Sequence, residues 1–240
     1  MKKDISNISS MSTEDKIASV VNDYNDIASE YCDEFCGTEV YNGFIDKWLQ
    51  TIGKGNILDV GCGGGNNCQY INQKEGFQAY GIDFSDGMIA EVRKRYPTVK
   101  IKKMDMTNIT FPDQQFNGIL SNCSLIHVPT ELLAQTLQGF KRILEPNGKL
   151  LLIVLEGNGD EMVEEPYREG QGVYAYTKYF TPEEISRLLK DNGFRVDEIE
   201  KRKTESENEL AGGELVVYAS NERVQELKEG NHLMDEMELG

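Results

Sequence analysis

The residues Ile57-Leu58-Asp59-Val60-Gly61-Cys62-Gly63-Gly64-Gly65-Asn66-Asn67 decide how the rest of the chain is interpreted. An apolar run that ends at Val60 and is followed by turn residues predicts a buried strand. The glycines after it allow positive φ angles and let a ligand approach the backbone closely. A helix is expected next, so the stretch predicts the strand, turn and helix that present backbone N–H groups to a bound cofactor.

Asp59 makes a dinucleotide an unfavourable ligand for this turn. In the dinucleotide pattern G-x-G-x-x-G, Gly61 and Gly63 fit, but Asn66 occupies the third position. A carboxylate beside the turn repels a pyrophosphate and attracts a cation. A tight turn that binds nothing is the alternative, although four glycines and an acid exceed what such a turn needs.

The full pattern Asp59-x-Gly61-x-Gly63-x-Gly65 resembles the first motif of the class I S-adenosylmethionine-dependent methyltransferases. The cofactor of that family carries an ammonium and a sulfonium group, which suits an acidic neighbour. The resemblance covers roughly residues 20 to 220. It implies an α/β fold: a Rossmann-like, seven-stranded, mostly parallel sheet with helices on both faces and an antiparallel last strand. It also implies S-adenosyl-L-methionine as the cofactor.

Two further acids follow predicted strands. Asp83 ends the strand 77–83 and lies 22 residues after Gly61, close to the spacing at which an acid meets ribose hydroxyls. A carboxylate can accept from both hydroxyls at once. Asp105 follows the strand 99–104, and the resemblance implies that it accepts from the adenine amino group. The predicted cofactor-binding residues are Asp59, Gly61, Cys62, Gly63, Asp83, Phe84, Met88, Asp105, Met106, Asn122 and Cys123.

Candidate catalytic and substrate-binding residues come from three other segments. Residues 24–31 resemble the N-terminal segment that closes the active site of small-molecule methyltransferases, which makes Tyr24 a catalytic and Tyr31 a substrate-binding candidate. An amphipathic helix packed on the core is the alternative for Tyr31. His127 follows the fourth strand and could accept a proton from a substrate nucleophile, or could serve structure. Tyr174 and Tyr176 are substrate-binding candidates in the aromatic connection 156–180, which is either a lid or a solvated loop.

The sequence predicts one domain with two embellishments. Residues 1–11 are expected to be disordered, and residues 12–220 to form the methyltransferase domain. Within it, 12–53 forms a helical cap, including one helix over 12–31, and 156–180 a lid insertion. A turn at 146–149 should lead into the strand 150–155, and the strands 194–199 and 214–219 should close the sheet. Residues 221–240 are expected to form an acidic tail.

Composition limits the classes of partner. A net charge of −16 argues against a broad nucleic-acid surface, which needs Lys and Arg to neutralise phosphates. The charge points to a small molecule or a protein as the substrate, and a small molecule is the prediction. No apolar run suits a membrane span or a signal peptide, and a cytoplasmic protein is expected. Five cysteines without regular spacing suggest reduced thiols. Cys32 and Cys36 share a helical face, but nothing nearby completes a metal site, so no metal is expected.

The predicted reaction is in-line transfer of a methyl group to a small-molecule acceptor of unspecified identity. Catalysis would come mainly from positioning the donor carbon and the nucleophile in a dry site. A non-catalytic S-adenosylmethionine-binding regulator stays open as an alternative. An aminopropyltransferase-like enzyme fits less well because no paired acids for a polyamine are identifiable. A nicotinamide oxidoreductase conflicts with Asp59 and Asn66.

Overall fold

The computed structural model describes residues 8–164, 174–203 and 213–222. Its strands are β1 (Gly55–Val60), β2 (Phe77–Asp83), β3 (Lys100–Lys103), β4 (Phe116–Asn122), β5 (Leu144–Leu155), β6 (Asp160–Glu164), β7 (Tyr174–Lys178), β8 (Phe194–Arg202) and β9 (Glu214–Asn221). The α-helices are α1 (Thr13–Asp26), α2 (Ala28–Phe35), α3 (Asn42–Ile52), α4 (Asn66–Asn72), α5 (Asp86–Arg95), α6 (Leu133–Ile143) and α7 (Pro182–Asp191). Short 3-10 helices are η1 (Ile8–Ser10), η2 (Leu125–His127) and η3 (Thr130–Leu132).

The main sheet confirms the predicted fold. It has seven strands in the order β3-β2-β1-β4-β5-β9-β8. The strands from β3 to β5 pair in parallel, and β9 is antiparallel to both β5 and β8. The strand order reverses between β1 and β4, and in open α/β sheets a ligand crevice forms outside the carboxyl ends of the strands at such a point.

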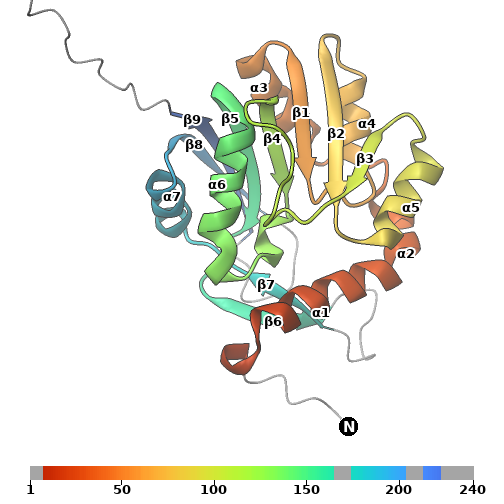
Figure 1. Cartoon of the computed structure of the whole chain (residues 1–240), viewed down its shortest axis with the longest axis vertical. Coiled ribbons are helices and arrows are strands. Elements are labelled where there is room, and N and C mark those ends of the chain that lie inside the picture. The colour runs from red at the N-terminus through yellow and green to blue at the C-terminus, as the bar shows by residue number, and fades with distance from the viewer. Residues whose placement is uncertain (1–7, 165–173, 204–212, 223–240) are drawn as a thin grey trace, which may run out of the picture.

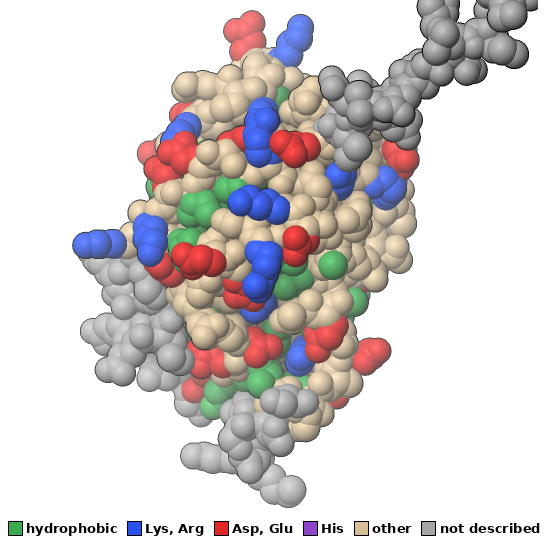
Figure 2. All heavy atoms as spheres, turned by 90° about the vertical axis from the view of Figure 1, so that its left-hand side faces the viewer, with side chains coloured by type: hydrophobic (Ala, Val, Ile, Leu, Met, Phe, Trp, Pro, Cys, Tyr) green, Lys and Arg blue, Asp and Glu red, His purple; other side chains and the backbone are tan. Residues whose placement is uncertain are grey.

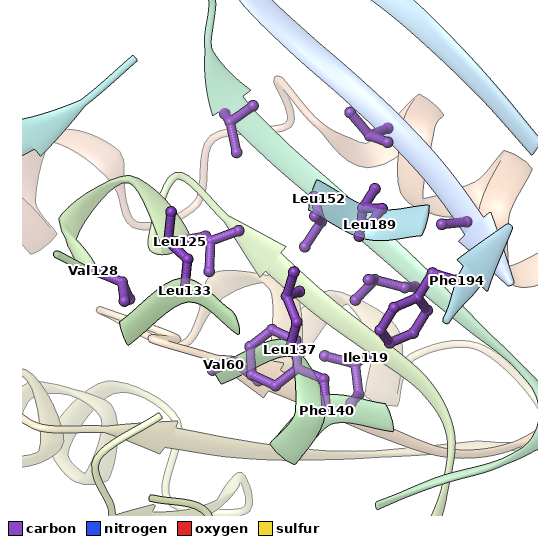
Figure 3. Packing of buried hydrophobic residues seen from close by; sticks show 14 of the residues in the cluster. Val60, Ile119, Leu125, Val128, Leu133, Leu137, Phe140, Leu152, Leu189 and Phe194 are labelled. Carbon is purple, nitrogen blue, oxygen red and sulfur yellow. The ribbon is translucent and has the colours of Figure 1, made fainter. Parts of the chain in front are cut away.

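Helices cover both faces of the sheet and bury a separate apolar cluster on each. Along β5, Leu150, Leu152 and Val154 face the cluster under α6 and α7, whereas Leu151 and Ile153 face the cluster under α3, α4 and α5. This alternation is the period of two that a strand imposes on its side chains. Figure 3 shows the first cluster, with α6 and α7 side chains packed against the sheet.

Two predicted segments differ from the observed ones. The predicted turn at 146–149 lies inside β5 as a bulge. The register with β4 shifts there, since Phe116 pairs with Leu144 and Gly118 with Lys149, and Asn147 has a φ of 64°. The predicted single helix over 12–31 breaks at Ile27, whose ψ is 3°. The break lets α2 turn along α5, where the Asn25 side chain accepts hydrogen bonds from Ser85 Oγ and the Gly87 backbone N–H.

The connection over 156–180 contains an antiparallel hairpin, β6 and β7, outside the main sheet. Figure 1 shows this hairpin beside α1, below the carboxyl ends of β1 and β2. Residues 165–173 of the predicted lid lie outside the described residues. The predicted disorder covers residues 1–11, but residues 8–10 form η1. Residues 1–7 and most of the predicted acidic tail, 223–240, lie outside the described residues.

No helix within the described ranges combines the length and apolar character needed to cross a membrane. On the face in Figure 2, Lys and Arg side chains are interspersed with Asp and Glu, so that face presents no continuous basic surface.

Two glycines give a paired test of the packing. A Cβ on Gly118 would lie 2.7 Å from both Ile52 Cδ1 and Trp48 Cζ2, so Gly118→Ala should lower the free energy of unfolding by about 1–3 kcal/mol. A Cβ on Gly139, inside α6, would meet nothing within 4 Å, so Gly139→Ala should raise it by about 0.5–1 kcal/mol. Urea unfolding measures both values, and equal effects of one sign would contradict this description of the core.

Candidate functional site

A pocket lies at the carboxyl edge of the sheet beneath α1. Its floor comes from the ends of β1 and β2 and from the loops after β3 and β4, and its roof comes from apolar side chains of α1. The lining residues are Ile17, Val20, Val21, Gly61, Asp83, Phe84, Met104, Asp105, Met106, Thr107, Ser124, His127, Val128 and Pro129.

The glycine turn is shaped by conformations that other residues rarely adopt. Gly61, Gly63 and Gly65 have φ angles of 65°, 49° and 80°. A Cβ on Gly61 would come within 2.5 Å of Ser124 Cβ, so the turn packs directly on the loop after β4. Ser124 Oγ also donates to the carbonyl of Val60, which joins that loop to the end of β1.

Asp83 is oriented by the backbone. Its Oδ2 accepts from the Gly63 N–H at 2.9 Å and its Oδ1 from the Ser85 N–H at 2.8 Å. Burial raises the pKa of Asp83 to about 6, and these backbone hydrogen bonds oppose the rise. Each carboxylate oxygen has more than one acceptor site, so Asp83 can still accept from ligand hydroxyls in the pocket.

Asp105, Phe84 and Met106 also line the pocket, as their predicted roles require. Asp105 Oδ1 accepts from both the backbone N–H and the hydroxyl of Thr107 at 2.8 Å, which holds the carboxylate at the pocket edge. Phe84 is 39% exposed although it is a large apolar side chain, and a planar ligand ring would cover it.

Asp59 lies beneath the turn and does not line the pocket. Its side chain is fully buried, and Oδ2 accepts from the Cys68 thiol at 3.6 Å. Burial raises the pKa of Asp59 to about 7, and the hydrogen bond from Cys68 and the nearby Asn67 side chain oppose that rise. The Oδ1 atom has no hydrogen-bond partner among the described residues. An unpaired buried acceptor fits a cationic group above the turn, and its contact with the cofactor stays a prediction.

Four other predicted cofactor residues, Cys62, Met88, Asn122 and Cys123, do not line the pocket. Cys62 packs in the core with Cys68 under Gly81, and Met88 packs against Ala28 and Cys32. Asn122 ends β4, and Cys123, with a φ of 50°, lies 3.9 Å from the Tyr41 hydroxyl. Their cofactor roles stay predictions.

The structure brings Tyr24 and His127 together. The Tyr24 hydroxyl lies 3.0 Å from His127 Nε2, and His127 Nδ1 lies 2.8 Å from the carbonyl oxygen of Tyr176. A carbonyl only accepts, so Nδ1 carries the proton, Nε2 has its lone pair free, and the Tyr24 hydroxyl donates to it. Burial lowers the pKa of His127, which favours this neutral form.

The other predicted substrate residues occupy different places. Tyr31 stands edge-on to Tyr24 at 5.9 Å and approaches Gly63, so it lies next to the cofactor turn. The Tyr176 side chain is buried and donates to Asp160 Oδ2 at 2.8 Å, so Tyr176 serves His127 through its backbone. Tyr174 begins β7 opposite Glu164. Substrate contacts of these tyrosines stay predictions.

Sequence reasoning missed the roof of the pocket and the support of His127. Ile17, Val20 and Val21 show helical spacing, which predicts a buried face but not that the face covers a pocket. Ser19 Oγ accepts from the Tyr176 N–H at 3.3 Å, a contact between residues 157 positions apart that no local pattern signals.

Parts of the chain are similar in sequence to known methyltransferases. Residues 57–148 match the model of a family described as a methyltransferase domain. The phosphoethanolamine N-methyltransferase of Plasmodium falciparum is 27% identical over 142 residues, 58% of this chain and 53% of that protein. The maize phosphoethanolamine N-methyltransferase 1 is 32% identical over 120 residues, 48% of this chain and 23% of that protein. The chain thus spans about half the length, or less, of these curated relatives.

Solved structures share the fold. A Burkholderia thailandensis 1,6-didemethyltoxoflavin N1-methyltransferase, with its substrate and S-adenosylhomocysteine bound, matches with a TM-score of 0.69 at 16% identity, covering 89% of this chain and 92% of the other. An S-adenosylmethionine-dependent methyltransferase from Methanosarcina mazei matches with a TM-score of 0.65 at 20% identity, covering 75% and 97%.

The sheet order, the glycine turn and the two carboxylates at the next strand ends define a class I methyltransferase fold. Residues 57–148 match a methyltransferase domain, and the chain shares its fold with solved S-adenosylmethionine-dependent methyltransferases, whose names give S-adenosylmethionine as the cofactor. Asp83, Asp105 and the turn at Gly61 fit that cofactor, because they offer oriented acceptors and a backbone surface that a side chain at Gly61 would fill.

The raised pKa of Asp83 predicts a pH dependence of cofactor binding. In the free protein the Asp83 carboxyl is protonated below about pH 6. Ribose hydroxyls are donors that favour the ionised form, so binding should release protons near this pH. We expect S-adenosylhomocysteine to bind roughly tenfold more weakly at pH 5 than at pH 8.

Calorimetry in buffers of different ionisation enthalpy measures the released protons, and Asp83→Asn is the control that should remove the part of the release that comes from Asp83. Affinity that does not change between pH 5 and pH 8 would show that Asp83 does not titrate in the binding site.

Proposed function

We propose that the protein transfers a methyl group from S-adenosylmethionine to a nitrogen or oxygen nucleophile of a small molecule. The observation that carries the proposal is the Tyr24–His127 pair next to the pocket that Asp83 and Asp105 line. A protein that only bound the cofactor would not need a histidine whose tautomer and orientation favour accepting a proton.

The described lining of the pocket suits a neutral or cationic acceptor. Its side chains are apolar apart from the carboxylates Asp83 and Asp105, the hydroxyls of Thr107 and Ser124, and His127. Similar proteins are named as a phosphoethanolamine N-methyltransferase, a ubiquinone biosynthesis O-methyltransferase and a 1,6-didemethyltoxoflavin N1-methyltransferase, and these names supply candidate classes of acceptor. Which of these classes this chain methylates is part of the proposal.

The chain's own residues would act by positioning and by proton transfer. S-adenosylmethionine supplies an electrophilic methyl group on its sulfonium. Ile17, Val20 and Val21 keep water away from the pocket. Neutral His127 can take the Tyr24 proton at Nε2 while the Tyr24 oxygen takes one from the acceptor, and the Tyr176 carbonyl holds the Nδ1 proton of the charged imidazole.

Incubating the protein with methyl-labelled S-adenosylmethionine and a metabolite extract tests the proposal. We expect the label to enter a small molecule, with stoichiometric S-adenosylhomocysteine as the second product. A chain that binds the cofactor but labels neither small molecules nor added panels of amines and phenols would be a regulator. Transfer of an aminopropyl group from the decarboxylated donor would indicate the other alternative.

A further inference from the structure

Two cysteines converge on the glycine turn from the segment above it. A Cβ on Gly64 would lie 2.3 Å from Cys36 Sγ and 2.6 Å from Cys32 Sγ, so the two sulfurs share the space over this glycine. Cys32 lies on α2 and is fully buried, whereas Cys36 is the C-cap of α2 and is half-buried. Solvent therefore reaches the pair through Cys36.

The end of α2 lets these sulfurs approach further. Residues four apart on a helix have Cβ atoms about 5–6 Å apart, and a disulfide needs about 3.5–4.5 Å. Cys36 has already left the helix, with a ψ of 122°, and Gly37 follows with a φ of 95°. Closing the gap therefore requires movement at a helix end and not inside a helix.

That movement would reach the cofactor turn by two routes. Cys36 Sγ donates to the carbonyl of Gly64 at 3.6 Å. Asn66, the first residue of α4, holds the end of α2 at both sides of Cys36: its Nδ2 donates to the Phe35 carbonyl, and its Oδ1 accepts from the Gly37 N–H at 3.2 Å. Gly64 and Asn66 belong to the segment that forms the cofactor turn and starts α4.

The surroundings favour reaction at Cys36. The hydrogen bond from the Cys32 thiol lowers the pKa of Cys36 and Arg95 acts in the same direction, whereas burial and the carboxylates of Glu91 and Asp33 oppose the lowering. The thiolate is the form that attacks an oxidant, and a second thiol nearby resolves the product. Among the described residues no group of three or more His, Cys, Asp or Glu side chains could hold a metal, so the pair is not part of a larger metal site.

We propose that Cys32 and Cys36 form a peroxide-sensitive dithiol whose oxidation weakens cofactor binding. The Cys36 thiolate attacks one oxygen of hydrogen peroxide, the O–O bond breaks, and the leaving hydroxide takes a proton to become water. The Cys32 thiol then attacks the Cys36 sulfenic sulfur, the S–O bond breaks, and a second water leaves with the Cys32 proton. Two electrons pass from the sulfurs to the peroxide. The effect on cofactor binding rests on the proposed function, whereas disulfide formation does not.

The chain contains a matched control pair. Cys62 and Cys68 also lie against one glycine, with their sulfurs 2.7 and 3.2 Å from the Cβ position of Gly81. Both are buried, and the hydrogen bond with Cys68 together with burial raises the pKa of Cys62 well above its usual value. They should stay reduced under conditions that oxidise Cys32 and Cys36.

The test treats the full-length protein with hydrogen peroxide and maps its thiols by differential alkylation and mass spectrometry. We expect a disulfide between Cys32 and Cys36 while Cys62 and Cys68 remain alkylatable after unfolding. Calorimetry should show S-adenosylhomocysteine binding at least about tenfold more weakly to the oxidised protein, with recovery after dithiothreitol. In the Cys36→Ser and Cys32→Ala variants, the affinity for S-adenosylhomocysteine should be the same before and after peroxide treatment.

Two results would overturn the proposal: Cys32 and Cys36 staying alkylatable after peroxide, or a mapped Cys32–Cys36 disulfide with unchanged affinity. If the reduced protein does not bind S-adenosylhomocysteine, the proposed function fails instead, and the thiol map alone decides whether the dithiol forms. Circular dichroism of each variant confirms that it is folded before the comparison.

Discussion

Asp83→Ala should raise the dissociation constant for S-adenosylhomocysteine by about 100- to 1,000-fold at pH 8, because each lost hydrogen bond to a charged acceptor is worth about 1.5–3 kcal/mol. The wild-type carboxylate is already aimed by the backbone N–H groups of Gly63 and Ser85. The variant would lose acceptors for the ribose hydroxyls and would also leave these two N–H groups without their partner. Isothermal titration calorimetry measures the change.

Asp86→Ala is the matched control. Asp86 lies three residues further on, at the start of α5, and its exposed side chain pairs with Lys103. A surface ion pair contributes little, so this variant should bind within about twofold of the wild type. An Asp83→Ala protein that is folded, by its unfolding midpoint, and binds as tightly as the wild type would remove Asp83 from the cofactor site.

His127→Asn and Tyr24→Phe should each lower kcat by about 100-fold or more once an acceptor is known, because positioned proton transfer contributes about 10²–10⁴-fold. Tyr24→Phe removes only the hydroxyl that lies 3.0 Å from His127 Nε2, and the ring can keep its edge-on contact with Tyr31. The change should appear in kcat more than in the affinity for S-adenosylhomocysteine. Steady-state kinetics and calorimetry on the same preparations separate these effects.

The pH profile gives the same pair an independent test. The base must be neutral, so the rate falls as pH falls through the pKa of His127, which burial places below its ordinary value of 6.5. Wild-type kcat should therefore stay level from pH 8 to below 6.5, where a solvent-exposed histidine would already be half protonated. Tyr70→Phe removes a hydroxyl that donates to Asp46 on another helix and should change nothing. A Tyr24→Phe enzyme with wild-type kcat would contradict the assignment.

The features that sequence predicts well are those whose chemistry is local. The glycine turn and Asp83 come at the ends of the apolar strands β1 and β2, and Asp105 follows the lysine-rich strand β3, so spacing along a few residues locates them. The sheet follows from the same strands, together with the family resemblance that supplied their order.

The features that sequence could not predict depend on contacts between distant residues. At the break between α1 and α2, Asn25 accepts hydrogen bonds from Ser85 and Gly87, which are 60 and 62 residues further along the chain. The tautomer of His127 depends on the Tyr176 carbonyl, which only the β6–β7 hairpin brings into reach. Cys32 and Cys36 read as ordinary thiols until the structure places Gly64 beneath them.

We propose that the pocket under α1 binds S-adenosylmethionine through the glycine turn and Asp83. The most direct measurement is a calorimetric titration of the reduced wild-type protein with S-adenosylhomocysteine and, separately, with NAD. We predict saturable binding of S-adenosylhomocysteine with one site per chain and no saturable heat with NAD. Saturable binding of NAD with no response to S-adenosylhomocysteine would show that the pocket is not an S-adenosylmethionine site.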